Sequence, residues 1–115
     1  MADEFQKIFK EGMEYVENYK SLEETVHGMG CLLLGHNIFG WDLKAIKKDS
    51  EGYLLKKKET CDNIERIRSK YPADFFSDID KNYDFKGLVK DFEIGYVEVS
   101  DFITKAEEEE EKKTN

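Results

Sequence analysis

Cysteine and proline are scarce in this chain of 115 residues, and each shortage restricts what the protein can be. The two cysteines, Cys31 and Cys61, form neither a CxxC motif nor a disulfide framework, so we expect two free, buried thiols in a reducing compartment. The only proline, Pro72, excludes helical geometry at Tyr71 and is therefore expected to end a helix there.

Long apolar runs and a targeting signal are lacking too. No stretch of the sequence reaches the ~18 consecutive apolar residues of a membrane span. The N-terminal sequence has neither the basic region nor the apolar run of a signal peptide. We therefore expect a cytoplasmic protein.

Motifs for catalysis and cofactor binding are also missing. The glycines between Gly28 and Gly35 break the spacings of phosphate-binding and dinucleotide-binding loops, and the segment lacks the lysine of a P-loop. The one Cys–His set is Cys31 with His27 and His36, and its apolar surroundings disfavour the reactive thiolate. We expect a protein that is not an enzyme and that holds no cofactor.

Two patterns resemble metal sites without completing one. Glu24 and His27 form a single E-x-x-H motif, whereas di-iron bundles carry two. The oxygen-bearing residues between Asp78 and Asp84 resemble the first half of an EF-hand loop, but both possible registers lack the glycine at the sixth position. We expect no metal ligand in either pattern.

Charge is absent from one stretch, Thr25 to Trp41, although 38% of the chain is charged. This stretch holds both histidines, the only tryptophan and four of the eight glycines. Helical spacing places Gly28, Cys31 and Gly35 on one side, where a neighbouring backbone could come close. We expect this stretch to be the buried structural centre of the protein.

Apolar spacing predicts a mainly α, single-domain bundle of four to six helices over residues 1–106, followed by an acidic tail, 107–115, that is disordered or frays. An amphipathic helix is expected over 3–20, and a capping box from Ser21 to Glu24 would start a second helix at Leu22. A helix over 60–71, a short helical turn over 73–79 and a long helix capped by Asp84 follow.

The segment 41–59 admits two interpretations. The sequence Asp49-Ser50-Glu51-Gly52 suits a turn that would close a β-hairpin, or a loop between two helices with Ser50 as a cap. Two-residue alternation is poor on both arms, and lysine, alanine and leucine favour a helix. We favour the helix and keep the hairpin as the alternative.

The net charge of −8 is unevenly distributed. Six lysines stand against two acids between Lys44 and Lys58, whereas the sequence from Asp74 onward has thirteen acids and six lysines, a balance of −7. Such a surface repels nucleic acid and anionic membranes and attracts basic proteins.

The acids from Asp84 onward form a ridge along the predicted C-terminal helix. Asp84, Asp91 and Glu98 recur every seven residues, and Asp101 follows three residues later. Because seven residues span about 10.5 Å of helix axis, the ridge alone does not match the ~3.4 Å rise of phosphates in DNA. The residues that we expect to bind a partner are Asp78, Asp80, Tyr83, Asp84, Asp91, Glu93, Tyr96, Glu98 and Asp101.

These observations support three functional hypotheses. The first is an acidic, non-catalytic protein that binds a basic partner stoichiometrically, as an inhibitor, an immunity protein or a nucleic-acid mimic. The second is a helical small-molecule or metal-binding protein with a site at His27, Cys31, His36 and Trp41. The third is a homo-oligomeric scaffold subunit that associates through the small-residue face at Gly28 and Gly35.

Overall fold

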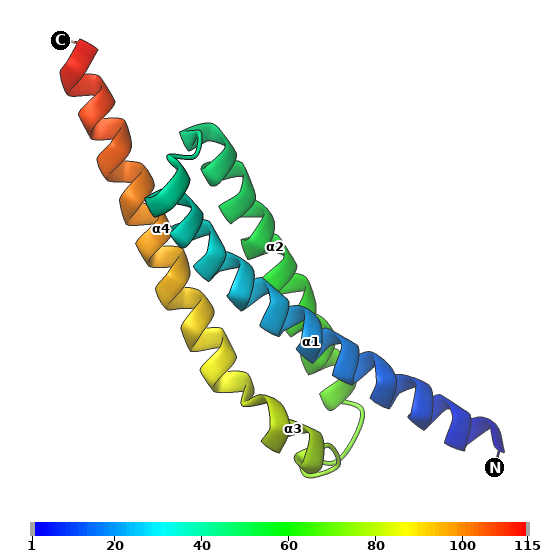
Figure 1. Cartoon of the computed structure of the whole chain (residues 1–115). Helices are drawn as coiled ribbons and strands as arrows, with labels where there is room; N and C mark the ends of the chain where they lie inside the picture. Colours follow the sequence, from blue (N-terminus) through cyan, green and yellow to red (C-terminus); the bar gives the residue numbers. More distant parts are fainter. Residues whose placement is uncertain (1, 115) are drawn as a thin grey trace.

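The computed structural model describes residues 2–114, which form three long helices and one short helix and contain no strand. The elements are α1 (Ala2–Phe39), α2 (Leu43–Arg68), α3 (Ser77–Tyr83) and α4 (Phe85–Thr114). The long helices lie side by side in a rod with extents of 71 × 22 × 22 Å, in which α1 packs against both α2 and α4 (Figure 1). The mainly α-helical bundle is therefore confirmed.

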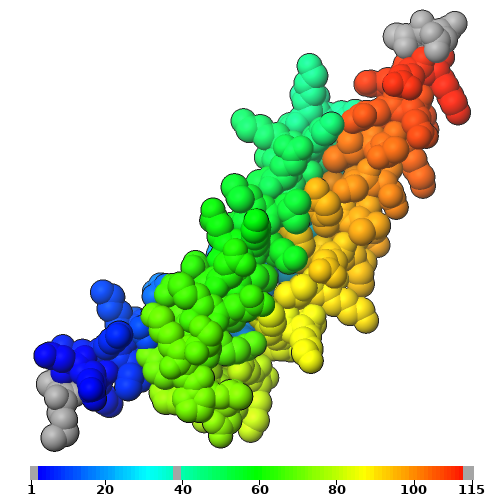
Figure 2. Space-filling model, turned by 180° about the vertical axis from the view of Figure 1, so that it is seen from behind, coloured from blue at the N-terminus to red at the C-terminus, as the bar shows by residue number. Residues whose placement is uncertain are grey.

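The two ends of the chain project from opposite ends of the rod. The first turns of α1 extend past the end of α2, and the last turns of α4 extend past the other end of the bundle (Figure 1). From behind, α2 and α4 cover most of the rod, and the N-terminal turns of α1 protrude beyond them (Figure 2). The helix α4 continues to Thr114. Fraying is an exchange between conformations, so the expected fraying or disorder of 107–115 stays a prediction.

The predicted helix boundary at Ser21 is wrong, because α1 runs through it without a break. The buried side chains of Tyr15, Tyr19 and Leu22 continue one face across the proposed cap. The hydroxyl of Thr25 donates a hydrogen bond to the backbone carbonyl of Ser21 at 2.8 Å, as it does inside a helix. Burial of this continuous face stabilises an unbroken helix more than the capping box would stabilise a new helix start at Ser21.

The segment 41–59 is helical from Leu43 onward, so the hairpin alternative and the loop at Asp49–Gly52 are both wrong. The helix α2 starts after Asp42, whose carboxylate accepts a hydrogen bond from the backbone N–H of Lys44 at 3.3 Å. Ser50 is a buried residue inside α2, and its hydroxyl donates to the carbonyl of Lys47 at 2.8 Å. As expected, the helix ends before Pro72, at Arg68.

The interior consists of two clusters along the rod rather than one centre. The cluster near α3 contains Tyr15, Tyr19, Leu22, Ile64, Ile67 and Phe76. The cluster toward the other end contains Met29, Leu32, Ile46, Phe92, Val99 and Ile103.

The uncharged stretch Thr25–Trp41 is therefore not the buried centre that the sequence suggested. It supplies Met29 and Leu32 to one cluster, while Leu34, Trp41 and Cys31 are exposed. A long helix in a three-helix rod buries only one face, so even an uncharged segment of it leaves apolar side chains in solvent.

Aromatic rings, and not a neighbouring backbone, occupy the space beside Gly28 and Gly35, two of the four glycines of this stretch. A Cβ atom on Gly28 would lie 2.5 Å from the Tyr53 ring, and one on Gly35 would lie 2.4 Å from the Trp41 ring. Both contacts are within the chain, and association of a second copy at this face stays a prediction.

Asp84 connects α3 to α4 and caps α4 as expected. Its backbone is left-handed, with φ 42°, which ends α3. Its carboxylate accepts a hydrogen bond from the backbone N–H of Gly87 at 3.3 Å. The short helical turn predicted over 73–79 lies four residues later, at Ser77–Tyr83.

Candidate functional site

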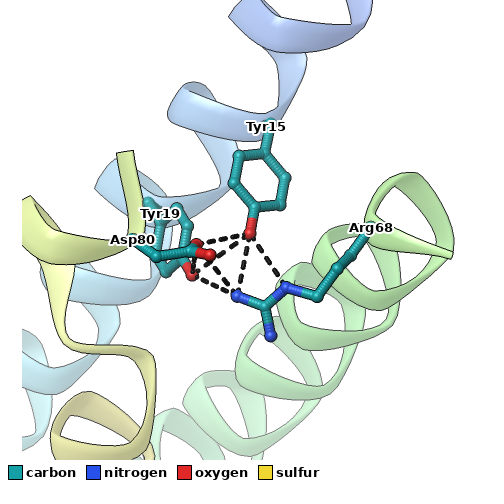
Figure 3. Close-up of polar contacts among 4 residues, drawn as sticks. All are labelled: Tyr15, Tyr19, Arg68 and Asp80. Carbon is teal, nitrogen blue, oxygen red and sulfur yellow. Dashed lines mark hydrogen bonds and ion pairs between the residues drawn. The ribbon is translucent and has the colours of Figure 1, made fainter. Parts of the chain in front are cut away.

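A polar cluster joins three helices at the end of the rod where α3 lies (Figure 3). The Oδ1 atom of Asp80 on α3 accepts hydrogen bonds from the hydroxyls of Tyr15 at 2.6 Å and Tyr19 at 2.7 Å, both on α1. Arg68 of α2 donates to the same oxygen at 2.9 Å and to the two tyrosine oxygens at 2.8 Å each. One carboxylate thus fastens α3 to the two longer helices.

The protonation states in this cluster are fixed by its contacts. Burial acts to raise the pKa of Asp80, but the hydrogen bonds from Tyr15, Tyr19 and Arg68 outweigh it and hold that pKa below its ordinary value. The pKa of Tyr19 is raised well above its ordinary value, mainly by burial and further by the hydrogen bonds with Tyr15 and Asp80. At neutral pH the cluster is an ionised Asp80 held by neutral phenols and a guanidinium, which makes it a structural clamp.

A second polar contact fastens the segment after α2 to α1. The hydroxyl of Tyr71 donates to the carboxylate of Glu11, and the ammonium of Lys70 lies 3.0 Å from the other Glu11 oxygen. The hydrogen bond to Glu11 raises the pKa of Tyr71 to about 12. The same hydrogen bond, with that from Lys70, lowers the pKa of Glu11.

Neither the clamp at Asp80 nor the contact of Glu11 with Lys70 and Tyr71 was predicted from the sequence. Tyr15 and Tyr19 are spaced four residues apart on α1, which could have suggested two phenols on one buried face. Nothing local in the sequence connects them to Arg68 or Asp80, which lie 49 and 61 residues beyond Tyr19.

The residues expected to bind a partner divide into two groups. Five have structural contacts within the chain. Asp80 belongs to the clamp, and Asp84 caps α4. Tyr83 stacks on Tyr19 with ring centroids 5.0 Å apart, Tyr96 stacks on Phe92 at 6.1 Å, and Glu93 pairs with Lys57 at 3.9 Å.

The other four are exposed. Asp78 lies on α3, and Asp91, Glu98 and Asp101 lie on α4. Within residues 2–114 none of these four carboxylates forms an ion pair. They contribute charge to the surface without an evident role in holding the fold together.

Two exposed aliphatic residues accompany the acids of α4. Ile94 is 49% exposed and Val97 is 56% exposed. At about 100° per residue, both lie on the side of α4 opposite the buried Phe92 and Val99. We call the surface formed by Asp91, Ile94, Val97, Glu98 and Asp101 the α4 outer face.

The alternative site at His27, Cys31, His36 and Trp41 is not assembled. His27 contacts Cys31, with Nε2 3.4 Å from Sγ, on an exposed part of the helix. His36 instead packs on Phe102, and Trp41 covers Gly35. Among residues 2–114, no three side chains of histidine, cysteine, aspartate or glutamate come together as metal ligands could.

The chain was compared with protein-family models, curated proteins and solved structures, and none of these comparisons found a match. None of the helices in residues 2–114 combines the length and the apolar character that crossing a membrane requires.

Proposed function

We propose that this protein is a non-catalytic binding module whose α4 outer face takes a basic protein partner. The observation that carries the proposal is the combination, on one helix face, of Ile94 and Val97 with three exposed carboxylates that form no ion pair within residues 2–114. The exposed Lys90 and Lys105 share this face, which leaves it with an excess of one negative charge. The carboxylates would steer a basic partner and fix its orientation, and the two aliphatic side chains would supply apolar area at the centre of the contact.

The structure changes which residues we expect to hold the complex. Tyr83 and Tyr96 are engaged in the interior, so Ile94 and Val97 replace them as apolar anchors. Mimicry of a phosphate backbone would need Asp80 and Glu93 to fill the gaps of the ridge, and both have partners within the chain. We therefore favour recognition of a basic protein surface over nucleic-acid mimicry.

The free thiols support a reducing compartment, such as the cytoplasm, for this binding. Cys31 is exposed and unpaired, and Cys61 is half-buried and unpaired. Burial raises the pKa of the Cys61 thiol, which disfavours its reactive thiolate.

The proposal is tested by affinity capture from the native cell at low and high salt. The test variant carries Asp91→Lys, Glu98→Lys and Asp101→Lys, and the matched control carries Glu23→Lys, Glu24→Lys and Glu59→Lys at exposed sites on the other two long helices. The wild type and the control should capture the same basic protein, and the test variant should lose it. Binding should weaken as salt rises, because exposed charges are screened.

Circular dichroism of all three proteins establishes that each is folded. Capture of the same proteins by the folded test variant and by the wild type, at both salt concentrations, would contradict the proposal. Ile94→Ala with Val97→Ala should also weaken capture, but without changing its salt dependence.

A further inference from the structure

An apolar groove lies at the end of the rod from which the N-terminus projects. Its volume is about 560 Å³, and Ile8, Phe9, Met13 and Val16 of α1 line one side. Phe75 and Ile79 line the other side. We call residues 3–20 of α1 the arm.

Large apolar side chains of the arm are exposed to solvent. Phe5 is 72% exposed, Phe9 is 64% exposed and Met13 is 52% exposed. The first turns of the arm extend past the end of α2, so that helix does not cover them (Figure 1). A narrow stripe runs along this helix and covers about 60° of its circumference. It is formed by Phe5, Phe9, Gly12 and Val16.

We propose that this stripe docks on the same stripe of a second copy, with the two arms antiparallel across a twofold axis. Each arm would lie in the groove of the other copy, so that the exposed phenylalanines of one copy pack beside Phe75 of its partner. Such an interface is isologous and closes on itself.

Two charges to one side of the stripe favour this arrangement. Lys10 and Glu17 are exposed and lie on the same side of the arm, roughly 100° and 80° around the helix from Phe9. Neither forms an ion pair within residues 2–114. An antiparallel pair centred between Gly12 and Met13 brings Lys10 of each copy to within about one turn, 5.4 Å along the axis, of the partner's Glu17. A parallel pair would instead place this side of one arm beside the opposite side of the other, so Lys10 would not meet the partner's Glu17.

Gly12 suits the centre of the proposed contact. Nothing lies within 4 Å of the position that a Cβ atom on Gly12 would occupy. Two arms can therefore approach closely there, since neither has a side chain at the crossing point.

The apolar area at the groove is also of the right size for a dimer. The exposed parts of Phe5, Ile8, Phe9, Met13 and Phe75 amount to about 500 Å² per copy, given the usual area of large apolar side chains. Two copies would bury about 1,000 Å² of apolar surface, which reaches the lower limit for a specific interface.

Sedimentation velocity over protein concentrations from about 1 µM to about 500 µM tests the proposal. The wild type should shift from monomer to dimer across this range. Phe9→Glu should remain a monomer, because it places a carboxylate in the apolar contact. Leu55→Glu, at an exposed apolar site on α2, is the matched control and should dimerise as the wild type does.

A charge exchange tests the antiparallel register. Lys10→Glu alone and Glu17→Lys alone should each weaken dimerisation about tenfold, since each turns two exposed attractive pairs into repulsive ones. The double variant Lys10→Glu/Glu17→Lys should restore the affinity of the wild type, because both pairs are re-formed with their signs exchanged.

Three results would overturn the inference. They are a wild type that stays monomeric throughout the range, a Phe9→Glu variant that dimerises as the wild type does, and a double charge variant that is no stronger than the single variants. A monomeric wild type would leave the groove to a different chain. The α4 variants of the preceding section leave the arm intact and should dimerise normally, so this test and the test of partner binding are separate.

Discussion

Asp80 is the residue on which the attachment of α3 depends. Its Oδ1 atom accepts three hydrogen bonds from side chains on two other helices, and α3 itself has only seven residues. A helix that short is not stable alone, so its position is set by this clamp and by the packing of its neighbour Phe76 against Tyr15. Removing the Asp80 charge weakens the hold on the whole turn between α2 and α4.

Asp80→Asn should lower the free energy of unfolding by about 1–2 kcal/mol at neutral pH, because the hydrogen bonds to it lose their charged acceptor. The pKa of Asp80 is lowered in the folded state, so its contribution is fully present above the unfolded pKa of about 3.9 and is lost as the pH falls through the folded value. The difference between wild type and variant should therefore shrink below about pH 4.

Urea denaturation at several pH values measures this difference. Asp101→Asn is the matched control, since Asp101 is exposed and forms no ion pair among residues 2–114, and its stability should follow that of the wild type at every pH. A gap between Asp80→Asn and the wild type that is the same at pH 7 and pH 3 would show that the Asp80 charge is not what stabilises the clamp.

Among the elements, α1 and α2 meet closely where Gly28 faces the ring of Tyr53. The Cε1 atom of that ring lies 2.5 Å from the place of a Cβ atom on Gly28, a distance that no real Cβ tolerates. An interior glycine normally costs a helix about 1 kcal/mol relative to alanine. The packing of the Tyr53 ring offsets this cost at Gly28, whereas Gly30, two residues away, has nothing within 4 Å.

Alanine should therefore have opposite effects at these two glycines. Gly30→Ala should stabilise the protein by up to about 1 kcal/mol, which corresponds to a rise in Tm of roughly 4 °C. Gly28→Ala should lower Tm, because the new methyl group displaces the Tyr53 ring. Thermal melts followed by circular dichroism measure both effects. A rise in Tm for Gly28→Ala as large as that for Gly30→Ala would mean that the ring does not pack there.

The whole molecule is a rod because each long helix exceeds the width of a compact domain of this size. The radius of gyration is 18.5 Å, whereas a compact domain of similar length would have about 13 Å. The shape gives up part of the apolar burial that a compact fold achieves. It leaves the arm of α1 and the α4 outer face as separate surfaces, one for the proposed dimer and one for the proposed basic partner.

Small-angle X-ray scattering at low protein concentration tests this shape. The monomer should have a radius of gyration close to 18.5 Å and a maximum dimension close to 71 Å. The Phe9→Glu variant should give the same values at higher concentration, where the wild type should become longer. A radius near the ~13 Å of a compact domain would show that the ends fold back onto the bundle.

The sequence alone determined the helical class and the features that depend on neighbouring residues. The apolar spacing of α4, the cap at Asp84 and the end of α2 before Pro72 are local, because helical periodicity, side-chain capping and the geometry of proline act within a turn or two. Local signals were misleading at Ser21 and Ser50. Each resembles a cap, yet each lies inside a helix whose buried face continues past it.

Only the tertiary structure decided which polar residues support the fold and which face solvent. Asp80 and Asp101 look alike in the sequence, but Asp80 meets Tyr19 and Arg68 while Asp101 meets no charged partner in residues 2–114. Cys31 is exposed although its neighbours are apolar. Burial depends on which helices pack side by side, and that is set by contacts between residues far apart in the chain, which no local pattern of residues encodes.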